Sequence, residues 1–227
     1  MIEDRLRAIR ERISAAASRA GRDPQSVRML AVTKTHPRSV VDEARRAGIN
    51  LFGENRVQEA ASKYGDIAES VELHLVGHLQ RNKAKMVPGL FSWVESIDAL
   101  ATAQALSKRC EAAGWRCSVL VQYNSSGETS KSGYEDESLL LDEAEQMAGL
   151  AGLDVRGLMT IGPFVSDQAK IASAFARTRL LYERLRGRLG EAGVDTLSMG
   201  MTDDFEIAIA EGSTEVRIGS ALFGARS

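Results

Sequence analysis

The chain has 227 residues, of which 44% are hydrophobic and 26% charged, and its formal net charge is -2. This length is ample for a large α/β core, and the near-neutral balance excludes the basic stripe typical of nucleic-acid-binding proteins. No apolar stretch approaches the length of a membrane span, and the amino terminus lacks the apolar segment of a secretion signal. Cys110 and Cys117 are the only cysteines, so we expect free thiols, a reducing compartment and therefore a cytoplasmic protein.

The first element is an amphipathic helix from residue 2 to about residue 20, because Ile2, Leu6, Ile9 and Ile13 recur at helical spacing. Runs typical of buried strands follow, and helical patterns separate them, at 30–34, 49–52, 72–76, 91–95, 117–123, 153–160, 195–199 and 214–218. Eight such units predict a (β/α)8 TIM barrel with an extra amino-terminal helix, forming a single domain over 1–227. An open doubly wound sheet is the alternative, although no Gly-x-Gly-x-x-Gly follows the first strand.

The first predicted strand ends in Lys34, followed directly by Thr35, His36 and Pro37. The carboxyl ends of the strands carry the chemistry in α/β barrels. A partly desolvated lysine there can act as a nucleophile toward a carbonyl group. Taken alone, a lysine at a strand end is more often a solvated residue of the rim, so the other strand ends decide the interpretation.

Two loops rich in glycine and serine follow the last two predicted strands, Ser198-Met199-Gly200 and Gly219-Ser220. Barrels often bind a phosphate in these two loops, because glycines let backbone N–H groups approach the anion. Each loop alone is unremarkable in sequence. Together with Lys34 they indicate an aldehyde that bears a phosphate and is held as a Schiff base, the arrangement found for pyridoxal phosphate.

Metal binding is not expected. His74 and His78 are four residues apart, but they fall on a strand and the turn after it rather than on one helix face. No carboxylate stands near them at the spacing of a zinc ligand set. His36, beside Pro37, is expected to shape the turn rather than to bind a ligand.

Several motifs in this order resemble the YggS/PROSC family, the pyridoxal phosphate homeostasis or PLP-binding proteins. The resemblance runs from about residue 5 to Gly224, and its motifs are Leu30-Ala31-Val32-Thr33-Lys34, Phe52-Gly53-Glu54-Asn55, the segment from His74 to Lys83, Lys131-Ser132-Gly133, Gly157-Leu158-Met159, Ser198-Met199-Gly200-Met201 and Val216-Arg217-Ile218-Gly219. It implies a barrel similar to the amino-terminal domain of bacterial alanine racemase, a monomer, and pyridoxal 5'-phosphate as cofactor.

The resemblance also implies roles for individual residues. Lys34 would form the Schiff base and Arg217 would face the pyridine nitrogen, which keeps that nitrogen unprotonated and makes the ring a weaker electron sink. The remaining positions implied to lie around the cofactor are Asn55, His78, Ser198, Met199, Gly200, Gly219 and Ser220. Tyr123 and Thr202 depart from the residues usual in the family, and both are expected near the mouth of the pocket.

The function implied is intracellular homeostasis of pyridoxal phosphate: buffering the reactive aldehyde and delivering it to enzymes that require it, without robust catalysis. The alternative is an amino-acid racemase, which needs a second base. Racemases of this type take a tyrosine from a second domain, and we expect no such domain after the eighth strand. A Schiff-base aldolase is a third hypothesis, in which Glu54 would transfer the proton. Transient contact with PLP-requiring apoenzymes is expected, but binding to nucleic acid or membrane is not.

Overall fold

The computed structural model describes residues 1–128 and 131–224, and its centre is a closed barrel of eight parallel strands in sequential order. The strands are β1 (Arg28–Val32), β2 (Leu51–Glu54), β3 (Glu72–Leu75), β4 (Trp93–Ile97), β5 (Cys117–Tyr123), β6 (Leu153–Thr160), β7 (Thr196–Ser198) and β8 (Glu215–Ile218). Pairing of β1 with β8, from Arg28 opposite Glu215 to Ala31 opposite Ile218, closes the barrel. The predicted TIM barrel is confirmed, and the open sheet is excluded.

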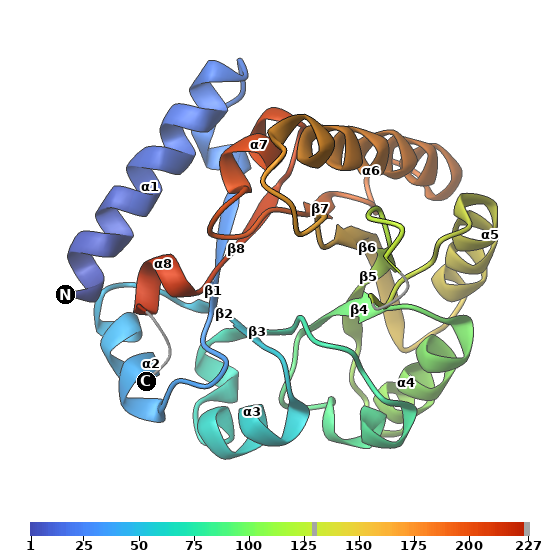
Figure 1. Ribbon diagram of the computed structural model, residues 1–227. Helices are drawn as coiled ribbons and strands as arrows, with labels where there is room; N and C mark the ends of the chain where they lie inside the picture. The colour runs from blue at the N-terminus through green and yellow to red at the C-terminus, as the bar shows by residue number, and fades with distance from the viewer. Residues whose placement is uncertain (129–130, 225–227) are drawn as a thin grey trace.

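The α-helices form a ring outside the strands, as Figure 1 shows. They are α1 (Ile2–Arg19), α2 (Arg38–Arg46), α3 (Val57–Tyr64), α4 (Leu100–Ala112), α5 (Glu137–Ala148), α6 (Gln168–Leu189), α7 (Phe205–Ala210) and α8 (Ser220–Phe223), with short 3-10 turns at Pro24–Ser26, Ala68–Ser70 and Arg81–Met86. Between β3 and β4 the connection is thus a 3-10 turn rather than an α-helix. The sequence did not predict α8.

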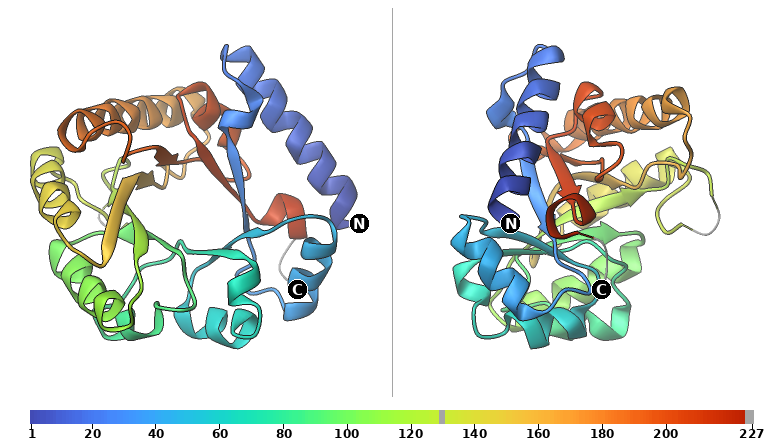
Figure 2. Two further views of the ribbon diagram at one scale, coloured as in Figure 1. Left: turned by 180° about the vertical axis from the view of Figure 1, so that it is seen from behind. Right: turned by 60° about the vertical axis from the view of Figure 1, so that its left-hand side comes forward.

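Helix α1 is the predicted additional helix before the first strand. Its apolar face is buried, including Leu6, Ile9 and Ile13, as their spacing predicts. It packs against α7 and α8 and lies along the outside of the barrel beside β1 (Figure 2). The helix therefore covers the part of the wall where the first and last strands meet.

The core consists of two separate apolar groups. The large one fills the space between the strands and the surrounding helices, and the small one contains Trp93, Leu120 and Met159. Because successive side chains of a strand point to opposite faces, the small group belongs to the barrel interior. Its Trp93 ring stacks on His74, with the ring centroids 5.0 Å apart. Polar residues thus share the interior with a small apolar layer.

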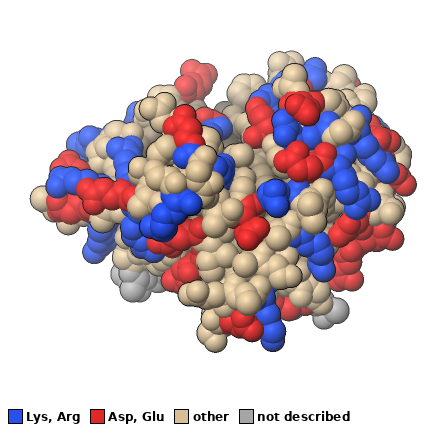
Figure 3. All heavy atoms as spheres, turned by 90° about the horizontal axis from the view of Figure 1, so that it is seen from above, with Lys and Arg blue, Asp and Glu red and all other residues tan. Residues whose placement is uncertain are grey.

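The surface seen from above intermixes acidic and basic side chains without a continuous area of one sign (Figure 3). Across residues 1–128 and 131–224, no helix combines the length and the hydropathy that crossing a bilayer requires. Cys110 and Cys117 are buried and free, as expected. The loop predicted over 124–133 includes residues 129–130, which lie outside the described part of the chain.

Candidate functional site

A cavity of about 260 Å³ opens at the carboxyl ends of the strands. It is lined by Val32, Lys34, His36, Asn55, Val76, Ile161, Met201, Thr202, Asp203, Arg217, Gly219, Ser220 and Gly224. Five of the residues predicted from sequence are in this lining, namely Lys34, Asn55, Arg217, Gly219 and Ser220. The structure therefore brings the candidate amine, a cation and one of the two predicted anion-binding loops into one place.

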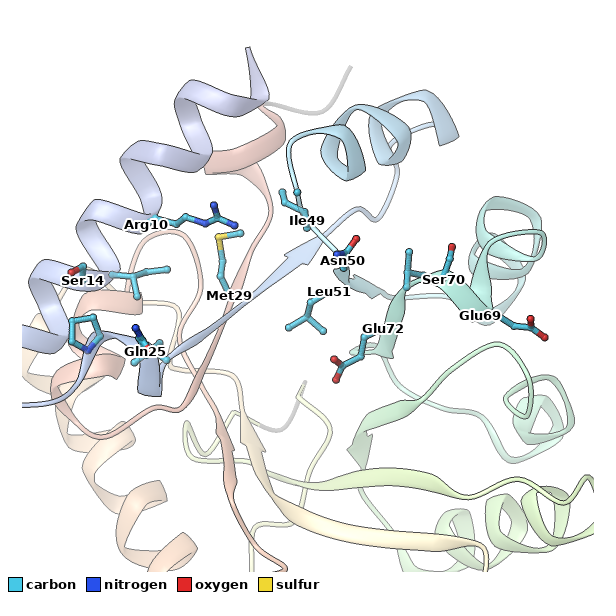
Figure 4. A pocket seen from close by; sticks show the side chains of 15 residues that line it. Arg10, Ser14, Gln25, Met29, Ile49, Asn50, Leu51, Glu69, Ser70 and Glu72 are labelled. Carbon is cyan, nitrogen blue, oxygen red and sulfur yellow. The ribbon is translucent and has the colours of Figure 1, made fainter.

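A larger cleft of about 620 Å³ lies at the opposite end of the barrel, between α1 and the beginnings of β2 and β3 (Figure 4). Its lining includes Arg10, Met29, Asn50 and Glu72 but none of the predicted site residues. Size alone does not identify a functional site. The smaller cavity is the better candidate because barrel enzymes and binding proteins use the carboxyl-terminal face.

Lys34 follows β1 by two residues and stands in a strained turn. Thr35 has φ +67°, the only positive φ of a non-glycine residue among the described residues. A β-branched residue is rare in this left-handed region, where it is held only by strong surrounding contacts. The backbone N–H of Thr35 donates to the Glu59 carboxylate at 2.6 Å. The lysine is therefore carried on a rigid turn rather than on a loose loop.

The residue before Lys34 is fixed from the other side. Thr33 is fully buried, and its hydroxyl donates to Glu54 at 2.7 Å and contacts the Tyr64 hydroxyl at 2.6 Å. The Lys63 ammonium donates to the Thr33 carbonyl, to Glu54 and to Glu59, at 2.8, 2.7 and 2.9 Å. Helix α3, which carries Lys63 and Tyr64, thereby anchors both flanks of Lys34.

Arg217 lies on β8, and its side chain is only 5% exposed. One terminal nitrogen donates to the Ser198 hydroxyl at 2.8 Å and the other donates to the Thr160 carbonyl at 2.7 Å. Since a guanidinium has five N–H donors, these two bonds leave others for a ligand in the cavity that Arg217 lines. A permanent positive charge is thus held in a fixed orientation at the cavity floor.

Of the two predicted anion-binding loops, only Gly219 and Ser220 line the cavity, and Thr202, which was not predicted to bind the anion, lies there beside them. The Thr202 hydroxyl contacts the Ser220 hydroxyl at 3.3 Å and accepts from the Ala221 N–H at 3.4 Å. Gly200 has φ +95°, and an added Cβ would come within 2.6 Å of the Ala208 Cβ. Only glycine fits this turn, which directs the chain from β7 toward Thr202.

Four of the predicted site residues do not line the cavity. Ser198 is fully buried beneath it, where its hydroxyl donates to Glu95 at 2.6 Å. Met199 is a core residue, and Gly200 contributes its carbonyl, which accepts the Arg217 N–H. His78 points elsewhere, with its Nδ1 2.9 Å from the Asp98 carboxylate.

The structure also shows where the proton-transfer groups of the two alternative hypotheses lie, namely Glu54 for an aldolase and a tyrosine for a racemase. Glu54 is fully buried against Lys63 and Thr33, outside the cavity lining. The chain has four tyrosines, and none of them is among the lining residues of the described chain. Their hydroxyls contact Thr33 (from Tyr64), Glu137 (from Tyr123), Glu143 (from Tyr134) and the Val194 carbonyl (from Tyr182). No tyrosine or Glu54 carboxylate is therefore positioned at the cavity.

The sequence placed Thr202 near the mouth of the pocket, and this residue lines the cavity, whereas His36 and Asp203 line it without having been assigned to it. The available signal for Thr202 was its position directly after the Gly200 turn, where the chain returns to the barrel mouth. His36 also contacts the Phe223 ring, with the centroids 5.4 Å apart, so it joins the first strand end to the last helix.

Comparison with known proteins identifies the relatives of this chain. Residues 5–227 match the family model described as alanine racemase, N-terminal domain. The pyridoxal phosphate homeostasis protein of Pseudomonas aeruginosa is 45% identical over 226 residues, covering 99% of this chain and 96% of that protein. Its Escherichia coli K12 counterpart is 42% identical over 230 residues, covering 99% and 97%.

Solved structures with a similar fold include members of the same family. PipY of Synechococcus elongatus, solved with PLP bound, has a TM-score of 0.85 at 33% identity, over 99% of this chain and 100% of that one. Alanine racemase of Clostridium difficile has a TM-score of 0.72 at 18% identity, over 98% of this chain and 57% of that one, which supports the barrel fold alone. The chain belongs to the family of pyridoxal phosphate homeostasis proteins, whose barrel is the alanine racemase N-terminal domain.

Proposed function

We propose that this protein binds pyridoxal 5'-phosphate in the cavity at the carboxyl ends of the strands and takes part in its homeostasis. The observation that carries the proposal is that Lys34, Arg217 and the neighbouring residues Thr202, Gly219 and Ser220 all line the same cavity. An amine, a buried cation and an anion-binding loop match the aldehyde, pyridine ring and phosphate of this cofactor. The PLP-bound structure of PipY, at 33% identity, supports the same assignment.

Each group has a distinct role in the proposal. The Lys34 amine attacks the aldehyde, water leaves, and a Schiff base joins lysine to cofactor. Thr202, Gly219 and Ser220 hold the phosphate, while Arg217 faces the pyridine nitrogen. In this assignment Thr202 replaces Ser198 as the phosphate ligand, because the Ser198 hydroxyl is buried between Arg217 and Glu95. Asn55, also in the lining, lies beside the ring.

The same geometry favours a carrier over an enzyme. A cation facing the pyridine nitrogen disfavours its protonation, and an unprotonated ring stabilises carbanions poorly. Among residues 1–128 and 131–224, no tyrosine lines the cavity to serve as a second base for racemisation, and Glu54 faces Lys63 rather than the cavity. A lysine that forms a reversible Schiff base, with no tyrosine in the described lining to act as the second base of a racemase, can store the aldehyde and release it. We therefore propose buffering and delivery of the cofactor to apoenzymes in the cytoplasm, by a monomer.

The first test is the visible absorption spectrum of the protein supplied with pyridoxal phosphate. We expect a yellow protein, loss of the colour on borohydride reduction, and a single reduced adduct on the peptide that contains Lys34. The variant Lys34→Ala should lose the adduct, whereas Lys85→Ala, an exposed lysine on the Arg81–Met86 turn, should retain it. A protein that takes up no cofactor, or an adduct on another lysine, would refute the assignment.

Delivery is tested separately by mixing the loaded protein with the apo form of a PLP-dependent enzyme and following the recovery of its activity. A carrier should restore activity while keeping the free aldehyde low. Rapid interconversion of an L-amino acid into its D-enantiomer by the loaded protein, beyond the rate with free cofactor, would instead establish the racemase hypothesis.

A further inference from the structure

Beneath the cavity, the barrel interior contains a hydrogen-bonded network of charged residues. From the top, Arg217 donates to the Ser198 hydroxyl at 2.8 Å, and that hydroxyl donates to Glu95 Oε2 at 2.6 Å. The second carboxylate oxygen of Glu95 contacts His74 Nδ1 at 2.7 Å. His74, Glu95 and Ser198 are all fully buried. The network therefore continues from the cavity floor into the middle of the barrel.

The network reaches solvent at the other end of the barrel. His74 Nε2 contacts Glu72 at 3.1 Å, and Arg28 donates to the same carboxylate at 2.6 Å. Both Arg28 and Glu72 have side chains 39% exposed. Glu72 also lines the cleft of Figure 4, which thus opens onto the lower end of the network.

Arg217 needs this network for a physical reason. Its guanidinium stays charged in proteins, and a charge that is only 5% exposed requires a counter-charge. Glu95, to which Arg217 is joined through the Ser198 hydroxyl, supplies the counter-charge. Burial raises the pKa of this carboxyl, but His74 and, to a smaller extent, Arg217 and Ser198 hold it below its ordinary value. A serine hydroxyl has one proton. Because Ser198 donates that proton to Glu95, its lone pairs face the guanidinium.

Glu215 completes the cluster without a hydrogen-bond donor of its own. Both of its carboxylate oxygens are buried without a partner, and they lie 3.8 Å from His74 Nδ1 and 3.9 Å from Arg28 Nε. Burial and the charge of Glu95 raise the pKa of Glu215 to about 8, although His74 and Arg28 oppose the shift. A proton on Glu215 therefore removes the surplus negative charge beside Glu95.

The cluster of His74, Glu95 and Glu215 is less suited to bind a metal ion than to hold protons and hydrogen bonds. One ligand atom from each of His74, Glu95 and Glu215 lies within 4.8 Å of the others. Both ring nitrogens of His74, however, already contact carboxylates, and the Arg28 guanidinium beside Glu215 would repel a cation.

We propose that Glu95 is a positioning residue for the cofactor: held by His74, it fixes the Ser198 hydroxyl and so aims the Arg217 guanidinium into the cavity. The inference rests on the proposed function, because it explains how Arg217 is oriented toward a cofactor that the proposed function places in the cavity. It adds Ser198, Glu95 and His74 to the site as residues that act through Arg217 and do not touch the ligand.

The test compares Ser198→Ala and Glu95→Gln with two matched controls. Ser213→Ala removes another fully buried serine hydroxyl, one that donates to backbone carbonyls. Glu143→Gln neutralises a half-buried carboxylate outside the network, which accepts from the Leu100 N–H and the Tyr134 hydroxyl. We expect Ser198→Ala to weaken pyridoxal phosphate binding about 10-fold, and Glu95→Gln at least as much, because a charge-assisted hydrogen bond orients Arg217. The control variants should lose thermal stability but keep the affinity of the wild-type protein.

Two further readouts separate positioning from general destabilisation. In Ser198→Ala and Glu95→Gln with bound pyridoxal phosphate, the pH at which the pyridine nitrogen loses its proton should rise, because Arg217 is no longer oriented toward that nitrogen. The visible absorption spectrum follows this titration. In the cofactor-free protein, the Arg217 N–H signals in NMR should exchange faster with water in Ser198→Ala than in the wild type.

Unchanged affinity, spectral titration and Arg217 exchange in Ser198→Ala would overturn the inference, even if Glu95→Gln failed to fold. A stoichiometric metal ion in the purified protein would overturn the assigned roles of His74 and Glu95. Failure of the proposed function is a different result: there the wild-type protein itself would bind no cofactor.

Discussion

Two buried carboxylates of this barrel, Glu54 and Glu95, are stabilised in different ways. Glu54, at the end of β2, faces α3 and meets the Lys63 ammonium at 2.7 Å. Glu95 lies inside the barrel, where the nearest ring nitrogen is that of His74 at 2.7 Å. The first is paired with the ammonium group of a lysine on a helix. The second shares its surroundings with a further buried carboxylate, Glu215, and depends on where protons reside.

This difference matches the tasks of the two regions. The Lys63 group holds the backbone on both sides of Lys34, so it must keep one geometry at every pH at which the protein works. The group inside the barrel extends from Arg217 toward the opposite end of the barrel. Its ionisable residues lie on several strands, and they are Arg28, Glu72, His74, Glu95, Glu215 and Arg217. A fixed ion pair serves rigidity, whereas a protonated cluster makes the interior sensitive to pH.

The largest effect is expected from Lys63→Met, which removes the cation and leaves Glu54 buried without its partner. One oxygen of Glu54 already lacks a hydrogen bond, and burial already raises the pKa of this carboxyl despite Lys63. We expect the free energy of unfolding at pH 8 to fall by about 3–5 kcal/mol, measured by urea denaturation. The loss should shrink toward pH 5, because a protonated Glu54 no longer needs a cation.

The matched control is Lys85→Met, which changes an exposed lysine and should alter the free energy of unfolding by less than about 0.5 kcal/mol. The double variant Glu54→Gln, Lys63→Met should recover part of the loss, since it removes both charges. If the single variant lost less than about 1 kcal/mol at pH 8, the Lys63 pair would not be the anchor that the geometry indicates.

Glu215→Gln tests the other region and should have an intermediate effect. The folded-state pKa of Glu215, about 8, lies above its ordinary value of 4.5, so the folded protein binds an extra proton between these values. Wild-type stability should therefore fall as pH rises through this window. Glutamine mimics the protonated acid, and we expect the variant to gain about 1–2 kcal/mol over the wild type between pH 5 and pH 8.

His74 must be separated from this effect. Burial lowers its pKa, but Glu215, Glu72 and Glu95 raise it to about 9, so its stabilising charge is also lost as pH rises, from 6.5 to about 9. Glu215→Gln removes the first slope and also reduces the second, because the charge of Glu215 is one of the groups that raise the pKa of His74. Urea denaturation at pH 5, 6.5 and 8, with the exposed Glu69→Gln as control, checks this. Parallel pH profiles of variant and wild type would show that Glu215 is ionised throughout.

The sequence predicted what depends on strand periodicity. The eight strands lie within a few residues of the predicted runs, because buried parallel strands are short apolar segments between helical patterns. Lys34, Asn55, Arg217, Gly219 and Ser220 follow from the same pattern, since the ends of parallel strands share one face of the barrel. Their proposed contacts with the cofactor remain predictions.

What sequence missed depends on side-chain direction inside the barrel. Ser198 was placed with the phosphate, but as the last residue of β7 it points to the interior, and Thr202 occupies the cavity lining instead. His74, Glu95 and Glu215 belong to different strands, far apart in sequence. Their meeting depends on the register that closes the barrel, which no local pattern encodes.

The smallest effect is expected from Thr35→Gly, in the strained turn beside Lys34. At φ +67° a threonine costs about 1–2 kcal/mol, and glycine removes this cost. Glycine also gains about 0.5–1 kcal/mol of conformational freedom in the unfolded chain, so the net stabilisation should be about 0.5 kcal/mol. Ser39→Gly, in the first turn of helix α2, should lose up to about 0.5 kcal/mol, because glycine is a poorer helix former than serine. If Thr35→Gly instead lost stability as Ser39→Gly does, the Thr35 side chain would contribute more through contacts than its backbone conformation costs, and the turn at Lys34 would be held by packing rather than kept under strain by the Lys63 and Glu59 contacts.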